Sequence, residues 1–322
     1  MSADTIPEIP RKISRRGFLK AMGALPVAMA IPPNEVASQH QLTVASLRLN
    51  RMETSPENIG FYTLKKLKDL FKQESPDLVI MPEFTFHIGD GNGYSLPLFL
   101  DKTPGGYKTQ EPTHQTIKHL LANARLLAAQ HQSSLFLGTF YELGTQDNKY
   151  YNTLLHIDPN GQIVGIKRKL YPPEGNFTIQ TRSGIPLRVL PLICGEAWWD
   201  IVTDQAGERK IKVPDWVKQG ARKTPYDMLT HSLAQGDLDF DRLAQTTQGS
   251  EKVEGGKAIE WLKSTFGFYY GEYLPYLKPH APIIVSDWGR EAGVFTGDLQ
   301  PLKNYIIKPD YTLVKFDARD LV

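Results

Sequence analysis

Short apolar runs and longer amphipathic stretches succeed one another along the chain, and they predict strands and helices. Apolar runs of strand length occupy residues 42–49, 77–81, 134–141 and 185–193. The run D-L-V-I-M at 77–81 is nearly continuous, which is typical of a strand buried on both faces. Apolar residues recur with helical spacing at 55–73 and at 113–131, which predicts two amphipathic helices. We expect Ser55 to cap the first of these helices, with Pro56 in its first turn.

Turn signals divide the rest of the pattern. The sequence Asp158-Pro159-Asn160-Gly161 stands between two alternating runs, residues 151–157 and 162–167, and predicts a β-hairpin. Residues 87–112 are rich in glycine, proline and aspartate, and we expect a loop there, at the rim of a site or on the surface. The pattern of residues 203–280 is less legible. Closing strands are expected at 282–288, 292–295, 304–307 and 312–316.

Three predicted strands end at a side chain that could take part in catalysis. Glu83 follows the strand at 77–81, Lys169 follows the second arm of the hairpin, and Cys194 follows the strand at 185–193. Sheets of α/β proteins place their chemistry at the carboxyl ends of buried strands, and a thiol becomes a nucleophile beside a base. Simpler explanations exist, since a lone cysteine is often buried for packing and a glutamate usually lies in a solvated loop.

Composition narrows the class of protein. The chain has 322 residues, 41% of them hydrophobic and 22% charged, which is ordinary for a soluble globular protein with a sizeable core. Five basic and two acidic residues give residues 1–30 a charge of +3, which leaves −1 of the total of +2 for the remainder. This argues against a nucleic-acid partner. His114 and His119 lack the spacing of a helical metal pair, so we expect no metal site.

The N-terminus predicts export. Residues 14–20 read S-R-R-G-F-L-K, and a modest apolar segment with a small-x-small site at Ala28-Met29-Ala30 follows. These are the parts of a twin-arginine signal, although a cytosolic basic helix is the alternative. We therefore expect residues 1–38 to be a signal peptide with a short linker, read by the twin-arginine export machinery, and the protein to be periplasmic or secreted. The apolar segment is too short to remain as a stable membrane anchor.

Three segments together resemble the nitrilase superfamily of carbon–nitrogen hydrolases. They are D-L-V-I-M-P-E-F at 77–84, Y-Y-N-T-L-L-H-I-D-P-N-G-Q-I-V-G-I-K-R-K-L-Y-P at 150–172, and P-L-I-C-G-E at 191–196. The middle segment is the most specific, because the hairpin, its turn and the following G-x-x-R-K occur together in order. The resemblance implies an α/β fold, a four-layer α-β-β-α sandwich of two mixed β-sheets, formed by one carbon–nitrogen hydrolase domain at 39–322.

The resemblance also implies roles for individual residues. Glu83 matches the family's base, Cys194 its nucleophile and Lys169 the cation that stabilises developing negative charge. Glu142 matches a second glutamate that helps to position the substrate and the lysine. The residues that flank these positions are candidates to line the pocket, or equally to pack in the core, and they are Phe84, Tyr171, Gly195, Trp198 and Trp199. Two departures bear on substrate choice: Gly195 replaces a common aromatic residue, and 228–232 lacks the common Asn/Pro pattern.

These residues predict an exported, cofactor-independent thiol hydrolase that cleaves the C–N bond of a small carboxamide through a Cys194 acyl-enzyme. Nitrile hydrolysis and acyl transfer use the same three residues and stay open as alternatives. A non-catalytic binding or assembly module with this fold is the alternative from another class. The partners that we expect are a small amide or nitrile substrate and a second copy of the chain, since family members generally form homo-oligomers.

Overall fold

The computed structural model describes most of the chain after residue 40. The described residues are 41–49, 54–55, 57–89, 95–181, 184–197, 201–203, 209–233, 270–286, 294–295 and 305–321. The predicted signal peptide at 1–38 lies outside the described residues, as do Trp198 and Trp199. Everything described falls within the predicted domain at 39–322.

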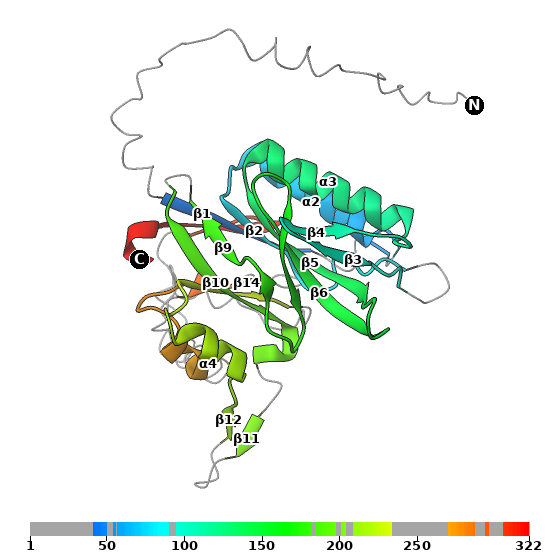
Figure 1. Ribbon diagram of the computed structural model, residues 1–322. Helices are drawn as coiled ribbons and strands as arrows, with labels where there is room; N and C mark the ends of the chain where they lie inside the picture. The colour runs from blue at the N-terminus through cyan, green and yellow to red at the C-terminus, as the bar shows by residue number, and fades with distance from the viewer. Residues whose placement is uncertain are drawn as a thin grey trace, which may run out of the picture. The chain divides into compact units, whose positions relative to one another are not determined.

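A large mixed sheet forms one layer of the fold (Figure 1). Its strand order is β16 (Tyr305–Ile307), β17 (Tyr311–Asp317), β1 (Gln41–Leu47), β2 (Leu78–Ile80), β5 (Ser134–Leu143), β6 (Tyr150–Ile157), β7 (Ile163–Arg168), β4 (Gly106–Thr109) and β3 (Leu100–Thr103), and β8 (Glu174–Gly175) also pairs with β7. Strands β1, β2 and β5 run parallel, whereas β5, β6 and β7 form an antiparallel meander.

A second mixed sheet packs against the first. Its order is β15 (Val294–Phe295), β14 (Ile283–Ser286), β13 (Met228–Ser232), β10 (Pro186–Ile193) and β9 (Thr178–Gln180), with the three central strands parallel. Apolar side chains from both sheets, including Phe136, Leu154, Leu187 and Ile284, form the core between them. A separate hairpin joins β11 (Ile201–Thr203) to β12 (Arg209–Ile211).

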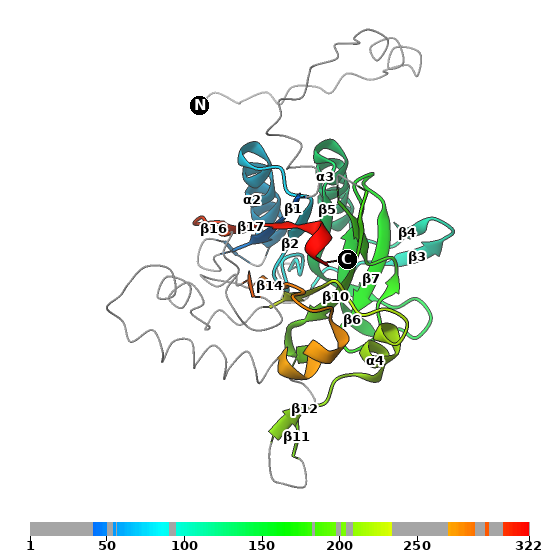
Figure 2. The same cartoon turned by 90° about the vertical axis from the view of Figure 1, so that its left-hand side faces the viewer.

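Helices cover the outer face of each sheet, as Figures 1 and 2 show. Helices α2 (Ile59–Gln73) and α3 (Gln115–His131) place leucines such as Leu67 and Leu120 against the large sheet. Helix α4 (Asp215–Ala221) and the 3₁₀ helix η4 (Gly271–Tyr276) cover the second sheet through Val217 and Tyr273. Two further 3₁₀ helices are η3 (Cys194–Ala197) and η5 (Ala318–Leu321). The layers therefore follow the order helix, sheet, sheet, helix, which confirms the predicted α/β fold with two mixed sheets.

Most predicted strands and helices agree with the structure, and the differences lie at turns and polar segments. Helix α2 begins at Ile59 rather than at Ser55, because Ser55 closes a turn in which its carbonyl accepts the Asn58 N–H (3.0 Å). Helix α3 begins at Gln115 rather than at Thr113, and His114 caps it: the His114 Nδ1 accepts the Thr116 N–H (3.2 Å).

The predicted loop at 87–112 contains the β3–β4 hairpin, whose turn is Pro104-Gly105. Proline and glycine there mark the reversal of a hairpin rather than an irregular loop. The less legible part of the sequence holds β12, α4 and β13, where α4 was missed because it buries little besides Val217.

Candidate active site

Glu83, Lys169 and Cys194 meet at one edge of the facing sheets. Glu83 lies three residues beyond the end of β2, and Lys169 and Cys194 directly follow β7 and β10. The Lys169 Nζ lies 2.9 Å from Glu83 Oε1, and the Glu83 carboxylate also accepts a hydrogen bond from the Cys194 thiol. Glu83 is fully buried, and Lys169 and Cys194 are partly exposed. The three residues predicted from separate segments therefore form one contiguous cluster.

Each of the three strand ends contains a non-glycine residue with positive φ. Phe84, next to Glu83, has φ 62°, Leu170, next to Lys169, has φ 70°, and Cys194 itself has φ 43°. Such conformations cost free energy and persist only where the surroundings hold them, and they are common at functional sites. The backbone at all three ends is therefore fixed in a strained geometry that aims adjacent side chains at a common point.

The electrostatics of the cluster keep the thiol protonated at rest. Burial raises the pKa of Cys194 to about 11, the negative charge of Glu83 acts in the same direction, and Lys169 and the Gly195 N–H oppose them. Burial alone would lower the pKa of Lys169, but the Glu83 carboxylate outweighs it and the pKa lies above its ordinary value. The site thus holds a neutral thiol beside an ammonium group and a carboxylate that can take the thiol proton.

Asn152 links two members of the cluster. Its Nδ2 donates to Glu83 Oε1, and its backbone carbonyl accepts the Lys169 N–H (2.9 Å). Side chains two residues apart on a strand share a face. Leu154 on β6 belongs to the core between the sheets, so the side chain of Asn152, two residues earlier, also faces the second sheet. The sequence contained this residue within the middle motif, but nothing in its spacing indicated that its amide would orient the carboxylate.

A buried histidine, His231, supports the backbone at Cys194. His231 Nε2 lies 2.7 Å from the Cys194 carbonyl oxygen, and its Nδ1 lies 2.6 Å from Tyr270 Oη. A carbonyl can only accept, so Nε2 carries the proton and Nδ1 accepts from the tyrosine. Burial lowers the pKa of His231 to about 3, so the ring is neutral. His231 falls in the 228–232 segment that departs from the family pattern, and it fixes the peptide that follows the thiol.

Glu142 lies on the opposite face of the large sheet from this cluster. It shares that face with Arg168 and Thr153, because side chains alternate along strands and Thr153 pairs directly with Arg168. The Glu142 carboxylate accepts Arg168 Nε (2.9 Å) and Nη2 (2.6 Å) as well as Thr153 Oγ1 (2.6 Å). The predicted supporting residue therefore contacts the arginine that precedes Lys169, not Lys169.

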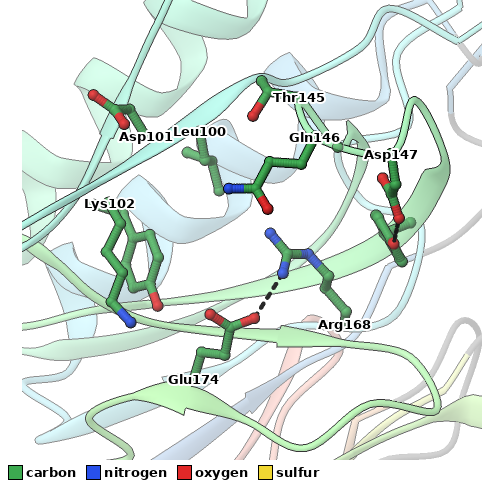
Figure 3. A pocket seen from close by; sticks show the side chains of 11 residues that line it. Leu100, Asp101, Lys102, Thr145, Gln146, Asp147, Arg168 and Glu174 are labelled. Atoms are coloured by element: carbon green, nitrogen blue, oxygen red, sulfur yellow. Dashed lines mark hydrogen bonds and ion pairs between the residues drawn. The ribbon is translucent and has the colours of Figure 1, made fainter.

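A polar cavity of about 370 Å³ opens on that same face (Figure 3). The β3–β4 hairpin, the turn at 144–147 and the ends of β7 and β8 surround it. Arg168 points into the cavity toward Glu174, and its Nη1 donates to Glu174 Oε1 (2.6 Å). Glu142 and Glu174 together engage Nε and both terminal nitrogens of the guanidinium, which uses three of its five N–H donors.

Known proteins were compared with the chain at the levels of sequence and structure. A family model described as carbon–nitrogen hydrolase matches residues 43–212, more than half of the 322 residues. The chain belongs to the carbon–nitrogen hydrolase family. The match includes Glu83, Lys169 and Cys194, and it confirms the predicted class of enzyme, a hydrolase of carbon–nitrogen bonds. No curated protein matches the hydrolase in sequence.

Solved structures with the same fold include a carbon–nitrogen hydrolase and a member of the nitrilase superfamily. The carbon–nitrogen hydrolase from Helicobacter pylori G27 is 16% identical, with a TM-score of 0.52, and the match covers 88% of this chain and 91% of that one. Nit3 of Saccharomyces cerevisiae is a member of branch 10 of the nitrilase superfamily. It is also 16% identical, with a TM-score of 0.52, and the match covers 87% of this chain and 91% of that one. At this identity the likeness establishes the fold of the hydrolase and nothing finer.

Three of the predicted pocket residues lie within the described part of the chain. Phe84 is partly exposed, with its backbone N–H bonded to Thr139 Oγ1 (2.8 Å), and its ring contacts His87 edge-on at 4.7 Å. Gly195 directly follows the thiol and directs its N–H toward the sulfur. Tyr171 is 47% exposed, and its ring meets that of Tyr151 edge-on at 5.4 Å. Phe84 and Gly195 therefore directly adjoin the charged cluster in the chain, whereas the ring contact of Tyr171 is with Tyr151.

The described residues were expected to hold no metal site, and their helices bear on whether the chain could cross a membrane. Among the residues that the structure describes, no group of three or more histidine, cysteine, aspartate or glutamate side chains could hold a metal ion. Within the same described ranges, no helix is long and apolar enough to cross a membrane.

Proposed function

We propose that this hydrolase is an exported amidase that cleaves a small carboxamide through a covalent Cys194 thioester. The observation that carries the proposal is the contact of the Cys194 thiol and the Lys169 ammonium with one buried carboxylate, Glu83. A nucleophile, a base and a cation within hydrogen-bond reach are the groups that acyl transfer needs. The proposed reaction therefore includes no cofactor.

In the first half-reaction Glu83 takes the proton of the Cys194 thiol as the sulfur attacks the carbonyl carbon. The need for a base follows from the thiol pKa of about 11, which leaves little thiolate at neutral pH. Negative charge then develops on the substrate oxygen, and the Lys169 ammonium and the Gly195 N–H stabilise it. When the C–N bond breaks, Glu83 returns its proton to the leaving nitrogen, and ammonia or an amine departs.

In the second half-reaction water hydrolyses the thioester. Glu83 removes a proton from the attacking water, and the same cation and N–H stabilise the second tetrahedral intermediate. The C–S bond breaks, the carboxylic acid leaves, and the proton held by Glu83 returns to the sulfur. Atoms balance as one amide and one water giving one acid and one amine.

The remaining site residues act around this core. Glu142 supports Lys169 from the other face of the sheet by holding Arg168, the residue before it. Phe84, Tyr171, Gly195, Trp198 and Trp199 are proposed to shape the pocket for the substrate. Gly195 has no side chain at the position where the family resemblance implies an aromatic one, and this difference is proposed to affect which acyl group the site accepts.

The decisive test is a comparison of wild type with Cys194→Ala over a panel of small carboxamides, with ammonia release as the readout. We expect the variant to lose turnover while it keeps its melting temperature, and we expect an acyl adduct on the Cys194 peptide of the wild type by mass spectrometry. Equal rates in both proteins would overturn the proposal. The same panel includes nitriles and an amine acceptor, so that nitrile hydrolysis and acyl transfer are read in parallel.

A protein that forms no adduct with any member of the panel would instead be a non-catalytic module with this fold. Export is tested separately by replacing Arg15 and Arg16 with lysine. We expect loss of the protein from the periplasmic or secreted fraction and a mature N-terminus downstream of residue 28 in the wild type. A homo-oligomer is expected from light scattering of the mature protein, and a monomer would contradict that part of the proposal.

A further inference from the structure

A second lysine–glutamate pair, which the proposed reaction does not use, lies next to the proposed catalytic cluster and bonds to the backbone beside Lys169 and Cys194. Lys167 and Glu196 form an ion pair whose side chains are 0% and 1% exposed. Lys167 lies two residues before Lys169 on β7, and Glu196 lies two residues after Cys194 in η3. The Lys167 Nζ lies 4.9 Å from the ring centre of Trp216, which α4 contributes.

Lys167 holds the backbone on both sides of Lys169. Its Nζ donates to the carbonyl oxygen of Arg168 (2.9 Å), to that of Tyr171 (2.7 Å) and to the Glu196 carboxylate. All three donor positions of the ammonium are therefore used inside the protein. Two of them fasten the short turn that presents Lys169.

Glu196 joins that turn to the strand of the nucleophile. Its Oε1 accepts the Leu170 N–H (2.6 Å) and its Oε2 accepts the Ile193 N–H (2.7 Å). Leu170 has positive φ, and Ile193 precedes Cys194, which also has positive φ. One carboxylate thus bridges two strained backbone segments that come from different sheets. Its own backbone carbonyl accepts Tyr273 Oη (2.7 Å), which ties it to η4.

Burial of such a pair is costly and gives little net stability, since well-packed apolar residues often serve as well. Its value must then lie in what its contacts hold in place. We propose that Lys167 and Glu196 are positioning residues that hold the Lys169 ammonium and the Cys194 sulfur at a fixed separation. This inference rests on the proposed function, because it assigns a purpose to the geometry that acyl transfer needs.

The test uses the double variant Lys167→Met/Glu196→Gln, which removes both charges together. Removing one partner alone would leave an unpaired buried charge and could prevent folding, whereas removing both is often tolerated. We expect kcat for the amide substrate to fall by about a hundredfold with little change in KM, because small misplacements of catalytic groups have effects of that size. Circular dichroism and thermal unfolding establish that the variant is folded.

The chain offers a matched control, a second buried lysine–carboxylate pair that contacts β10. Asp227, also buried, pairs with Lys278 (2.8 Å) and accepts the Arg188 N–H (2.6 Å) near the far end of β10 from Cys194. The control Asp227→Asn/Lys278→Met therefore removes a buried carboxylate that accepts from the β10 backbone, together with its lysine, without touching the site. We expect it to change the melting temperature and to leave kcat at the wild-type value.

A second readout does not depend on turnover. Iodoacetamide alkylates the Cys194 thiolate, and Lys169 lowers the pKa of that thiol. A displaced Lys169 should slow alkylation and move its pH midpoint upward in Lys167→Met/Glu196→Gln, but not in the control. If the proposed amidase activity is wrong, the wild type and both variants show no turnover. The alkylation of Cys194 then still tests the positioning role. Wild-type alkylation and wild-type kcat in a folded Lys167→Met/Glu196→Gln variant would overturn the positioning role.

Discussion

Two clusters of basic and acidic side chains flank the end of β7, and they lie on opposite faces of one sheet. The inner cluster, Lys169 with Glu83, faces the second sheet and the Cys194 thiol. The outer cluster, Arg168 with Glu142 and Glu174, faces a polar cavity. Consecutive residues at the end of one strand thus supply two clusters of similar composition, and only the inner cluster contacts the Cys194 thiol.

The clusters also differ in how many donors their partners occupy. Arg168 directs donors at two glutamates, and its guanidinium lies 5.0 Å from the ring centre of Tyr151. Lys169 Nζ, within the described part of the chain, has Glu83 as its hydrogen-bond acceptor. Each cation keeps two N–H donors beyond these bonds, three minus one for the ammonium and five minus three for the guanidinium. The two cations differ in what they face: Lys169 shares its carboxylate with the Cys194 thiol, where we propose that it binds a developing oxyanion, whereas Arg168 faces the polar cavity. The difference separates a reactive cation from a supporting one.

The largest effect should follow from neutralising the inner carboxylate. Glu83→Gln removes the base, and we expect turnover to fall by about 10²- to 10⁴-fold. The same change should lower the pKa of Cys194, because the Glu83 charge raises it, so alkylation should move to lower pH while turnover is lost. Glu142→Gln is the matched change on the outer face, and a comparable loss of turnover there would break the distinction.

A smaller effect is expected from the two cations. Lys169→Met should lower kcat by about 10²- to 10³-fold through loss of charge stabilisation in the transition state. It should also move the alkylation midpoint of Cys194 to higher pH, since the Lys169 charge lowers the thiol pKa. Arg168→Met should leave that midpoint at its wild-type value. The pH dependence of iodoacetamide labelling measures both, and an equal shift in both variants would contradict the assignment.

Stability should respond more than chemistry on the outer face. Glu142 is buried and bonded to Arg168 and Thr153, so Glu142→Gln should lower the free energy of unfolding by about 2 kcal/mol. Arg168 is 24% exposed, which limits the cost. Urea unfolding measures the change, and kcat should fall only modestly. An unchanged unfolding free energy would show that the outer ion pair contributes nothing.

The last effect appears only on acidification and leaves turnover at neutral pH unchanged: it concerns acid stability, to which the inner face contributes through a histidine. His156 on β6 is buried between Phe136 and Phe177, and burial lowers its pKa to about 4 from 6.5. The unfolded chain therefore binds the proton more readily, so stability present above pH 6.5 is lost as the pH falls toward 4. The shift corresponds to at most about 3 kcal/mol.

His156→Asn should flatten this acid slope. The asparagine amide can replace the Nδ1 contact with the Asn176 carbonyl (2.7 Å) without titrating. Thermal unfolding between pH 7 and 4.5 measures the slope. His87 and His231, whose pKa values burial lowers to about 4 and about 3, leave a residual slope. A slope unchanged in His156→Asn would assign the acid sensitivity to other groups.

The sequence was sufficient to predict the strands that carry the cluster because continuous apolar runs and a turn with proline and glycine are local signals. Each of Glu83, Lys169 and Cys194 could be named from its place at the end of such a run. The β3–β4 hairpin and the start of α2 could not, since Pro104 and Ser55 support more than one turn geometry. Local patterns leave that choice to tertiary contacts.

Partnerships between distant residues were beyond reach for a different reason. The G-x-x-R-K motif singles out Lys169, but the sequence gives no sign that Lys167 pairs with Glu196; the register of β6 with β7 and the turn at Leu170 place the two lysines. The same register places Glu142 on the outer face, whereas its motif position gave it a role beside the lysine. His231 and Glu196 gave no signal, because what they contact is the backbone around Cys194.

The protonated state of Cys194 has a consequence for the chemical durability of the protein. Peroxides and disulfides react with a thiolate and hardly at all with a neutral thiol. With its pKa raised to about 11 by burial and by Glu83, the resting sulfur exposes almost no thiolate to such reagents. The carboxylate that we propose to activate the sulfur during catalysis therefore also shields the resting thiol from oxidants, so purified protein should retain its single thiol in air without added reductant.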